Sequence, residues 1–106
     1  MNYDVVFTNA FAEDLSALAL YEAQFTLSVE LSYERLDGTV SEIEAALSSF
    51  PARNAAKPYG FTDVLRRKLL VGKYSAFYWI DEADNTVYVD RILYSKANFN
   101  RIHFGN

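Results

Sequence analysis

The sequence contains no cysteine, one histidine, two prolines and four glycines. Without cysteine there is no disulfide framework, no thiolate metal site and no cysteine nucleophile, and this composition favours a reducing compartment. No histidine and carboxylate have the spacing of metal ligands, so we expect neither a metal site nor a cofactor. The few prolines and glycines also exclude collagen-like and linker-type repeats.

Long apolar runs are also missing from the sequence. No stretch approaches the roughly 18 apolar residues that a membrane span requires. The first residues, Met1 to Asp4, carry no basic segment of the kind that opens a signal peptide. We therefore expect a cytoplasmic protein without a membrane partner.

The composition is sufficient for one folded core. The 106 residues are 51% hydrophobic and 23% charged, which excludes intrinsic disorder. A chain of this length buries roughly 65% of the surface that its unfolded form exposes. We expect a single domain that spans residues 1–106.

Charge is divided unevenly along the chain. Residues 1–52 hold nine acidic residues and one basic residue, a balance of −8, whereas residues 53–106 hold nine basic and five acidic residues, a balance of +4. This division predicts a molecule with an acidic layer and a basic face. The net charge of −4 opposes approach to a polyphosphate, so it favours a protein partner over a nucleic acid.

Two apolar stripes at helical spacing follow a β-like segment at residues 3–8. Thr8 can cap the first helix, and Glu13 and Asp14 lie in its first turns, where the helix dipole favours anions. The first stripe comprises Phe11, Leu15, Leu18, Tyr21 and Phe25. The second stripe keeps its phase across Gly38, which predicts one helix despite a cost of about 1 kcal/mol, and Pro51 ends it. Its members are Val29, Tyr33, Leu36, Val40, Ile43, Leu47 and Phe50.

The second half of the sequence predicts β-structure. Residues 51–63 contain both prolines and no clear period, which is typical of a long loop. Strands are expected at 64–71, 73–81 and 86–93, with turns at Gly72 and at residues 83–85. Ser95 can then cap a short last helix. The predicted order β-α-α-β-β-β-α is an α+β fold, in which a helical hairpin packs on one face of a mostly antiparallel sheet.

Alternation along the middle strand assigns its side chains to two faces. One face comprises Tyr74, Ala76, Tyr78 and Ile80, and the other comprises Ser75, Phe77, Trp79 and Asp81. Both faces are apolar enough to require cover, so we expect more than the helices to cover the sheet. On the helices, we expect the residues buried against the sheet to be Leu36, Val40, Ile43 and Leu47.

Three stretches of the sequence carry motifs whose order is typical of a known family. VVFTNAFAEDL at 5–15 combines a strand with a threonine-capped helix, and LSSFP at 47–51 ends the second helix. RRKLLVGKYSAFYWIDEADNTVYVDRILYSKANF at 66–99 joins an arginine-rich strand, a Val-Gly-x-Tyr turn and two further strands. In this order the stretches resemble the RelE/ParE superfamily of type II toxins over nearly the whole chain. The resemblance implies a toxin that is neutralised by a small antitoxin encoded beside it.

The resemblance leaves two mechanisms open. Members of the RelE branch cut mRNA in the ribosomal A site, whereas the ParE branch targets DNA gyrase and is not known for catalysis. In the RelE branch an arginine follows the tyrosine that opens the third strand, but here Ser75 stands at that position. Metal-free RNA cleavage needs a base, an acid and cations for the phosphorane. The constellation is incomplete here, so we favour a ParE-like inhibitor.

The nuclease alternative still has candidate residues. Tyr94, Lys96 and Arg91 are its catalytic candidates, with Lys68 as an additional contact to RNA. For Arg91, an ion pair with Asp90, Asp81 or an acidic residue of a helix is the structural alternative. The single histidine, His103, lies near the C-terminus and is a weak candidate.

A second set of residues predicts a binding surface for a protein. Arg66 and Lys68 belong to the densest basic cluster and share one face of their strand, where they form a rim for an acidic antitoxin or target segment. Protection of an edge strand by charge is the alternative explanation. Tyr74, Phe77 and Trp79 belong to the aromatic-rich strand, which is typical of a core or of a groove for a partner.

Overall fold

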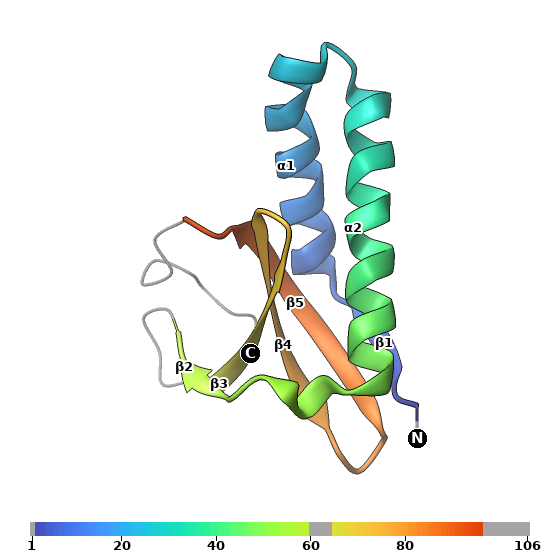
Figure 1. Cartoon of the computed structure of the whole chain (residues 1–106), viewed down its shortest axis with the longest axis vertical. Coiled ribbons are helices and arrows are strands. Elements are labelled where there is room, and N and C mark those ends of the chain that lie inside the picture. Colours follow the sequence, from blue (N-terminus) through green and yellow to red (C-terminus); the bar gives the residue numbers. More distant parts are fainter. Residues whose placement is uncertain (1, 60–64, 97–106) are drawn as a thin grey trace.

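The computed structural model describes residues 2–59 and 65–96, and it has two layers, a helical hairpin and a five-stranded sheet (Figure 1). The elements in chain order are β1 (Asp4–Phe7), α1 (Asn9–Thr26), α2 (Val29–Ser49), the short 3₁₀ helix η1 (Pro51–Arg53), β2 (Lys57–Pro58), β3 (Leu65–Val71), β4 (Tyr74–Asp81) and β5 (Thr86–Tyr94). This order confirms the predicted α+β fold. The last helix expected after Ser95 lies outside the described residues.

Both helices begin at side-chain caps. The Thr8 hydroxyl accepts a hydrogen bond from the Phe11 backbone nitrogen at 3.3 Å, and the Ser28 hydroxyl accepts one from the Leu31 nitrogen at 3.1 Å. Each bond satisfies one of the amides that a helix N-terminus leaves unpaired. Helix α2 runs through Gly38, which confirms the prediction of a single helix.

The sheet has the strand order β1-β5-β4-β3-β2. Strand β1 pairs in parallel with β5, and the other neighbouring strands are antiparallel, so the sheet is mostly antiparallel as predicted. A bulge interrupts the ladder between β4 and β5, because Phe77 lies opposite Arg91 while Tyr78 lies opposite Val89. Asp90 is the extra residue, and the bulge changes the direction of the side chains beside it.

The core lies between the helical hairpin and the sheet. Leu36, Ile43 and Leu47 of α2 are buried there, as predicted, whereas Val40 is only partly buried. On β4, Tyr74, Ala76 and Tyr78 belong to this core and Ile80 packs against it, which confirms the assignment of that face. Ser75 and Phe77 are also fully buried, so the opposite face of β4 is covered at these two positions.

The distal half of the hairpin comprises residues 19–35, and its end around the α1–α2 turn projects beyond the sheet (Figure 1). This projection contributes to a longest dimension of 43 Å against a shortest of 21 Å. Two members of the first apolar stripe, Tyr21 and Phe25, are 49% and 67% exposed. Val29 and Phe50, at the two ends of the second stripe, are exposed as well. The stripes predicted the helices correctly, but they extend further than the sheet that covers them.

The expected long loop after α2 is partly ordered secondary structure. Helix η1 and strand β2 lie within residues 51–59, which the sequence assigned to a loop. The Tyr78 hydroxyl donates to the Pro51 carbonyl at 2.5 Å, and the Asn54 side-chain amide donates to the same hydroxyl at 3.2 Å. The Arg67 guanidinium donates to the Asn54 carbonyl. These long-range contacts, invisible to a local pattern, hold the segment against the sheet.

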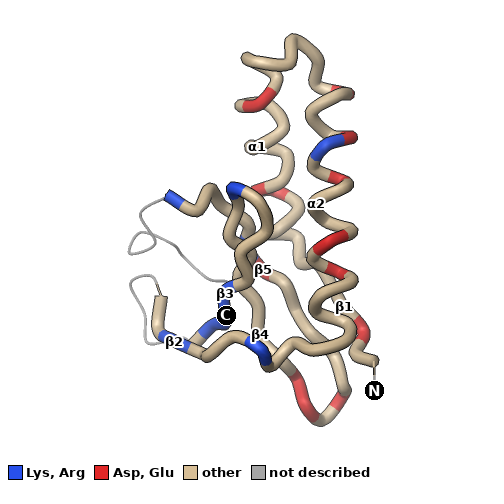
Figure 2. The backbone as a smooth tube through the Cα atoms, viewed as in Figure 1, with Lys and Arg blue, Asp and Glu red and all other residues tan. Residues whose placement is uncertain are grey.

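Charge follows the layers of the fold. Acidic residues lie along both helices and at the β4–β5 turn, whereas basic residues gather around η1, β2, β3 and the β3–β4 turn (Figure 2). Within the described part of the chain, neither α1 nor α2 is apolar and long enough to cross a membrane.

Candidate functional site

The sheet face opposite the helices carries a basic and aromatic surface. Lys68 of β3 and Phe77 of β4 are register partners, so their side chains share this face. The Tyr59 ring meets the Phe77 ring edge-on at 5.0 Å, and the Lys68 ammonium lies 5.9 Å from the centre of the Tyr59 ring. Trp79 stacks on Tyr88 with 4.6 Å between ring centres and is 37% exposed.

An open pocket of about 330 Å³ adjoins this surface. It is lined by Asn54, Ala55, Lys57, Tyr59, Lys68, Leu69 and Leu70. Two lysines and a tyrosine therefore converge where β3 meets the segment around β2. Such a rim suits an acidic segment of a partner.

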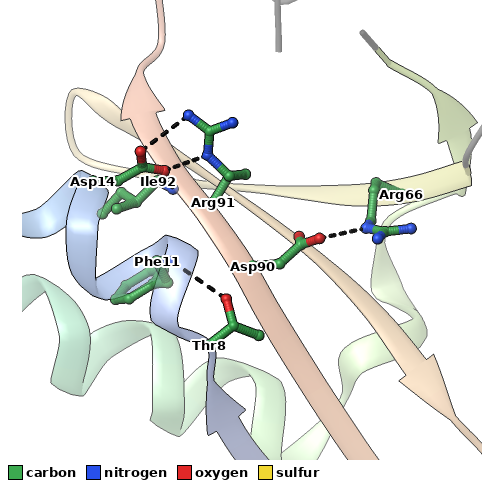
Figure 3. A network of polar contacts seen from close by, with 7 residues as sticks. All are labelled: Thr8, Phe11, Asp14, Arg66, Asp90, Arg91 and Ile92. Atoms are coloured by element: carbon green, nitrogen blue, oxygen red, sulfur yellow. Dashed lines mark hydrogen bonds and ion pairs between the residues drawn. The ribbon is translucent and has the colours of Figure 1, made fainter. Parts of the chain in front are cut away.

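Arg66 lies beneath the surface that the sequence predicted it to line. Its Nε donates to the Asp90 Oδ2 at 2.9 Å, and both side chains are at most 7% exposed (Figure 3). Burial raises the pKa of the Asp90 carboxyl, and the Arg66 charge acts in the opposite direction. The pair spans β4, because Asp90 is the bulge residue of β5 and Arg66 lies on β3. Arg66 thus has a structural role, because its buried ion pair with Asp90 links β3 to β5.

Tyr74 and Tyr94 are on the opposite side of the sheet, toward α1. The two rings stack with 5.2 Å between their centres, and both hydroxyls donate to Glu22 Oε1 of α1. The Lys73 ammonium lies 2.8 Å from the same oxygen. Tyr74, which was grouped with Phe77 and Trp79 as a binding residue, is therefore separated from them by the sheet.

This cluster has shifted pKa values. Hydrogen bonds from Lys73 and Tyr94 lower the pKa of Glu22, so the Glu22 carboxylate is ionised at neutral pH. Burial, followed by the hydrogen bond to Glu22, raises the pKa of Tyr74 to about 12, and the same two causes raise the pKa of Tyr94. Both tyrosines are poor proton-transfer groups near neutral pH, because efficient general acid–base catalysis needs a pKa near the working pH.

Arg91 is paired with an acidic residue of a helix, one of the alternatives that the sequence raised. Its guanidinium makes two hydrogen bonds to the Asp14 carboxylate, at 2.6 and 3.0 Å, and the Ile92 backbone nitrogen donates to the same carboxylate at 3.1 Å (Figure 3). Asp14 was expected in the first turns of α1, where the helix dipole favours anions, and it lies in the second turn. Asp14 also joins α1 to β5.

Three further residues bear on the nuclease alternative: Ser75, Lys96 and His103. Ser75 is buried, and its hydroxyl donates to the Ser95 hydroxyl at 3.3 Å. Lys96 is exposed in the turn after β5. His103 lies outside the described residues. Among the residues that the structure describes, no group of three or more acidic or histidine side chains has the arrangement of a metal site.

The structure thus separates the sequence-predicted residues into two groups. Lys68, Phe77 and Trp79 lie on the face opposite the helices, whereas Tyr74, Tyr94 and Arg91 contact acidic residues of α1. Sequence reasoning did not identify Asp14 and Glu22 as partners. Their spacing of eight residues, just over two helical turns, was the available signal, because it places them on similar sides of α1.

Comparisons with known proteins place this geometry in context. No protein-family model matches the chain, and no curated protein matches it. The toxin–antitoxin complex RelBE2 from Mycobacterium tuberculosis contains a similar chain, with a TM-score of 0.62 and 25% identity over 89% of this chain and 99% of the other. The chromosomal ParDE toxin–antitoxin system from P. aeruginosa gives a TM-score of 0.65 and 18% identity, over 87% and 95% of the two chains.

The structural neighbours and the sequence agree. The α+β fold that they share with this chain is the one that its motifs predicted. The match spans nearly the full length of both neighbouring chains, so it concerns the whole fold rather than a common fragment. The structural neighbours therefore support the resemblance to the RelE/ParE superfamily of toxins that the sequence motifs indicated.

Proposed function

We propose that this chain is the toxin of a type II toxin–antitoxin system, and that it is a ParE-like inhibitor which acts by binding a target protein, DNA gyrase. A cognate antitoxin neutralises it. The toxin–antitoxin complexes among its structural neighbours support an antitoxin as a partner. The basic and aromatic face around Lys68, Phe77 and Trp79 supports protein binding, because aromatic side chains are enriched at such interfaces.

The observation that carries the choice of mechanism is the engagement of the nuclease candidates with α1. Arg91 forms an ion pair with Asp14, and the Tyr94 hydroxyl donates a hydrogen bond to Glu22. A guanidinium already neutralised by a carboxylate stabilises a phosphorane poorly, and a tyrosine whose pKa is raised is a weak acid catalyst. Ser75, at the position of the family's nuclease arginine, supplies no charge and is buried.

The alternative is a RelE-like, ribosome-dependent mRNA endonuclease. It is favoured by the higher identity to the RelBE2 chain, 25% against 18% for the ParDE chain. The pocket beside Lys57 and Lys68 also has the charge that RNA phosphates require. Lys96 and Tyr94 are the residues on which this alternative depends.

Two assays on one preparation decide between these mechanisms. We expect the purified protein to inhibit supercoiling by DNA gyrase and to leave mRNA intact on programmed ribosomes. Tyr94→Phe and Lys96→Ala are tested beside the wild type. Loss of a principal catalytic group costs a nuclease roughly 10²–10³-fold in rate. Ribosome-dependent cleavage that either substitution abolishes would replace the inhibitor by the nuclease.

A further inference from the structure

The two long helices turn one face away from the sheet, and the distal part of this outer face carries exposed leucines. In α1, Leu20 lies two residues after the buried Leu18, and two residues turn a helix through about 200°. In α2, Leu31 lies five residues before the buried Leu36, which also brings it to the far side of its helix. Leu27 lies in the turn between the helices. We call Leu20, Leu27 and Leu31, which are 62%, 87% and 36% exposed, the leucine patch.

The turn that carries the leucine patch is held by hydrogen bonds. The Thr26 hydroxyl donates to the Ser28 carbonyl at 2.8 Å, and the Leu27 backbone nitrogen donates to the Ala23 carbonyl at 2.9 Å. A partner that covers the patch therefore has little backbone to order on binding. Exposed apolar clusters of this kind mark interaction sites.

The helical surface around the leucine patch is acidic, and Figure 2 shows acidic residues along both helices. Glu30 precedes Leu31 in the chain, and Glu34 lies three residues after it, close to one turn further along α2. Six acidic residues of the two helices are exposed and form no ion pair with any residue that the structure describes. They are Glu13, Glu30, Glu34, Asp37, Glu42 and Glu44.

The other charged residues of the two helices lie toward the sheet. Asp14 and Glu22 are paired with basic residues of β5 and of the β3–β4 turn, so they add no free charge. Arg35 is the one basic residue of either helix, and it lines a pocket with Lys73 and Tyr74 between α2 and that turn. The outer face is therefore negative around an apolar centre.

Charge complementarity selects the occupant of this face. A partner that covers the leucine patch meets unpaired carboxylates around it, so its own surface must be basic as well as partly apolar. The target protein in the proposed function has this chemistry, because an enzyme that binds DNA presents lysines and arginines to the phosphates. A second copy of the chain would set the same carboxylates against each other, because a two-fold contact pairs identical surfaces. A nucleic acid would be repelled.

We propose that the outer face of the helical hairpin docks on a basic, partly apolar surface of the target protein. The leucine patch forms the apolar centre of this contact, and Glu30 and Glu34 face lysines or arginines of the target. This proposal rests on the proposed function and deepens it, because it assigns target binding to the helical layer rather than to the Lys68 face of the sheet.

The apolar part of the contact is tested with Leu20→Ser and Leu31→Ser. Binding of each variant to the DNA gyrase holoenzyme is measured by biolayer interferometry, beside inhibition of supercoiling. The matched control is Phe50→Ser, because Phe50 is 58% exposed at the other end of α2, about 28 Å from Leu31 along the helix. We expect each leucine variant to weaken binding roughly 5- to 50-fold and the control to stay within about 2-fold. Thermal melting checks that every variant is folded.

The contribution of charge is measured with the double variant Glu30→Gln/Glu34→Gln. Its control, Glu82→Gln/Asp84→Asn, removes the same two charges from exposed positions near the β4–β5 turn. We expect the first pair to weaken binding to gyrase about 3- to 10-fold and to reduce the dependence of the affinity on salt, because these carboxylates act through screened attraction. Equal effects of the two pairs would show that net charge acts without a specific face, and would overturn the proposal.

The remaining outcomes separate the two proposals. If the wild type does not bind gyrase, the proposed target fails and this docking surface fails with it. If the wild type binds and both leucine variants bind as well as Phe50→Ser, the docking surface alone is overturned. If the leucine variants weaken binding of the protein encoded by the neighbouring open reading frame and leave gyrase binding unchanged, the face belongs to the antitoxin. If they change the molar mass in light scattering instead, it contacts a second copy. Either result overturns the proposal.

Discussion

The two halves of the helical hairpin share one apolar period but lie in different environments. The proximal half packs on the sheet through large apolar side chains, with Phe11, Ile43 and Leu47 at most 2% exposed. In the distal half, the buried contacts between the helices involve the small residues Ala19 and Ser32. The large apolar residues there point outward, and they include Phe25 at 67% exposed.

Hydroxyl groups hold the distal half together where the apolar core is absent. The hydroxyls of Thr26 and Ser32 are 2.9 Å apart, and Ser32 also donates to the Ser28 carbonyl at 3.1 Å. The Tyr33 hydroxyl donates to the Ser16 hydroxyl at 3.0 Å, which bridges the two helices. A single apolar period therefore describes two kinds of packing, and only the partner surface distinguishes them.

The largest effect is expected in the proximal half. Ile43→Ala should lower the free energy of unfolding by about 2–5 kcal/mol, because it removes buried methyl groups and leaves a cavity. Leu31→Ala, on the distal part of the same helix, is the control, and we expect it to cost less than about 1 kcal/mol because Leu31 is 36% exposed. Urea denaturation measures both values. Equal losses would show that the two halves are packed alike.

An intermediate effect is expected in the part of the distal half where α1 contacts the end of the sheet. Glu22→Gln removes the charge that accepts hydrogen bonds from Tyr74 and Tyr94, so we expect Tm at pH 7 to fall by about 5 °C. The pKa of Glu22 is lowered in the folded state, so its contribution is present above the ordinary value of 4.5 and is lost as pH falls below it. The difference in Tm between wild type and variant should therefore shrink below pH 4.5. A difference that persists unchanged at pH 3 would contradict this account.

The smallest effect is expected at the tip of the distal half. Leu27 ends α1 in the left-handed conformation, with φ of 62°, and is 87% exposed. Leu27→Gly should raise the free energy of unfolding by at most about 1 kcal/mol, because glycine adopts this conformation without a Cβ penalty and no buried surface is lost. Thermal unfolding measures the change. A loss above about 1 kcal/mol would mean that Leu27 packs against the protein.

The candidate site was less predictable than the fold. Alternation along β4 assigned Tyr74 and Phe77 to opposite faces correctly, since that period is a local property of a strand. It did not reveal that Tyr74 and Tyr94 share Glu22, because a contact across 52 or 72 residues leaves no local trace. The bulge at Asp90 was equally hidden, and it accounts for the position of Asp90 opposite Arg66.

The sequence by itself determined the two helices, the strands β1, β3, β4 and β5 and their order, and the resemblance to a known family, because caps, apolar periods and turn residues act over a few residues of chain. The tertiary structure decided which parts of each stripe are covered, which charges are paired and how residues 51–59 fold back on the sheet. The physical reason is that these features depend on contacts between residues that are far apart in the sequence. The hairpin extends beyond the sheet, so Tyr21 and Phe25 remain largely exposed. The charges of Arg66 and Arg91 are neutralised by carboxylates, and the Tyr94 hydroxyl donates a hydrogen bond to one.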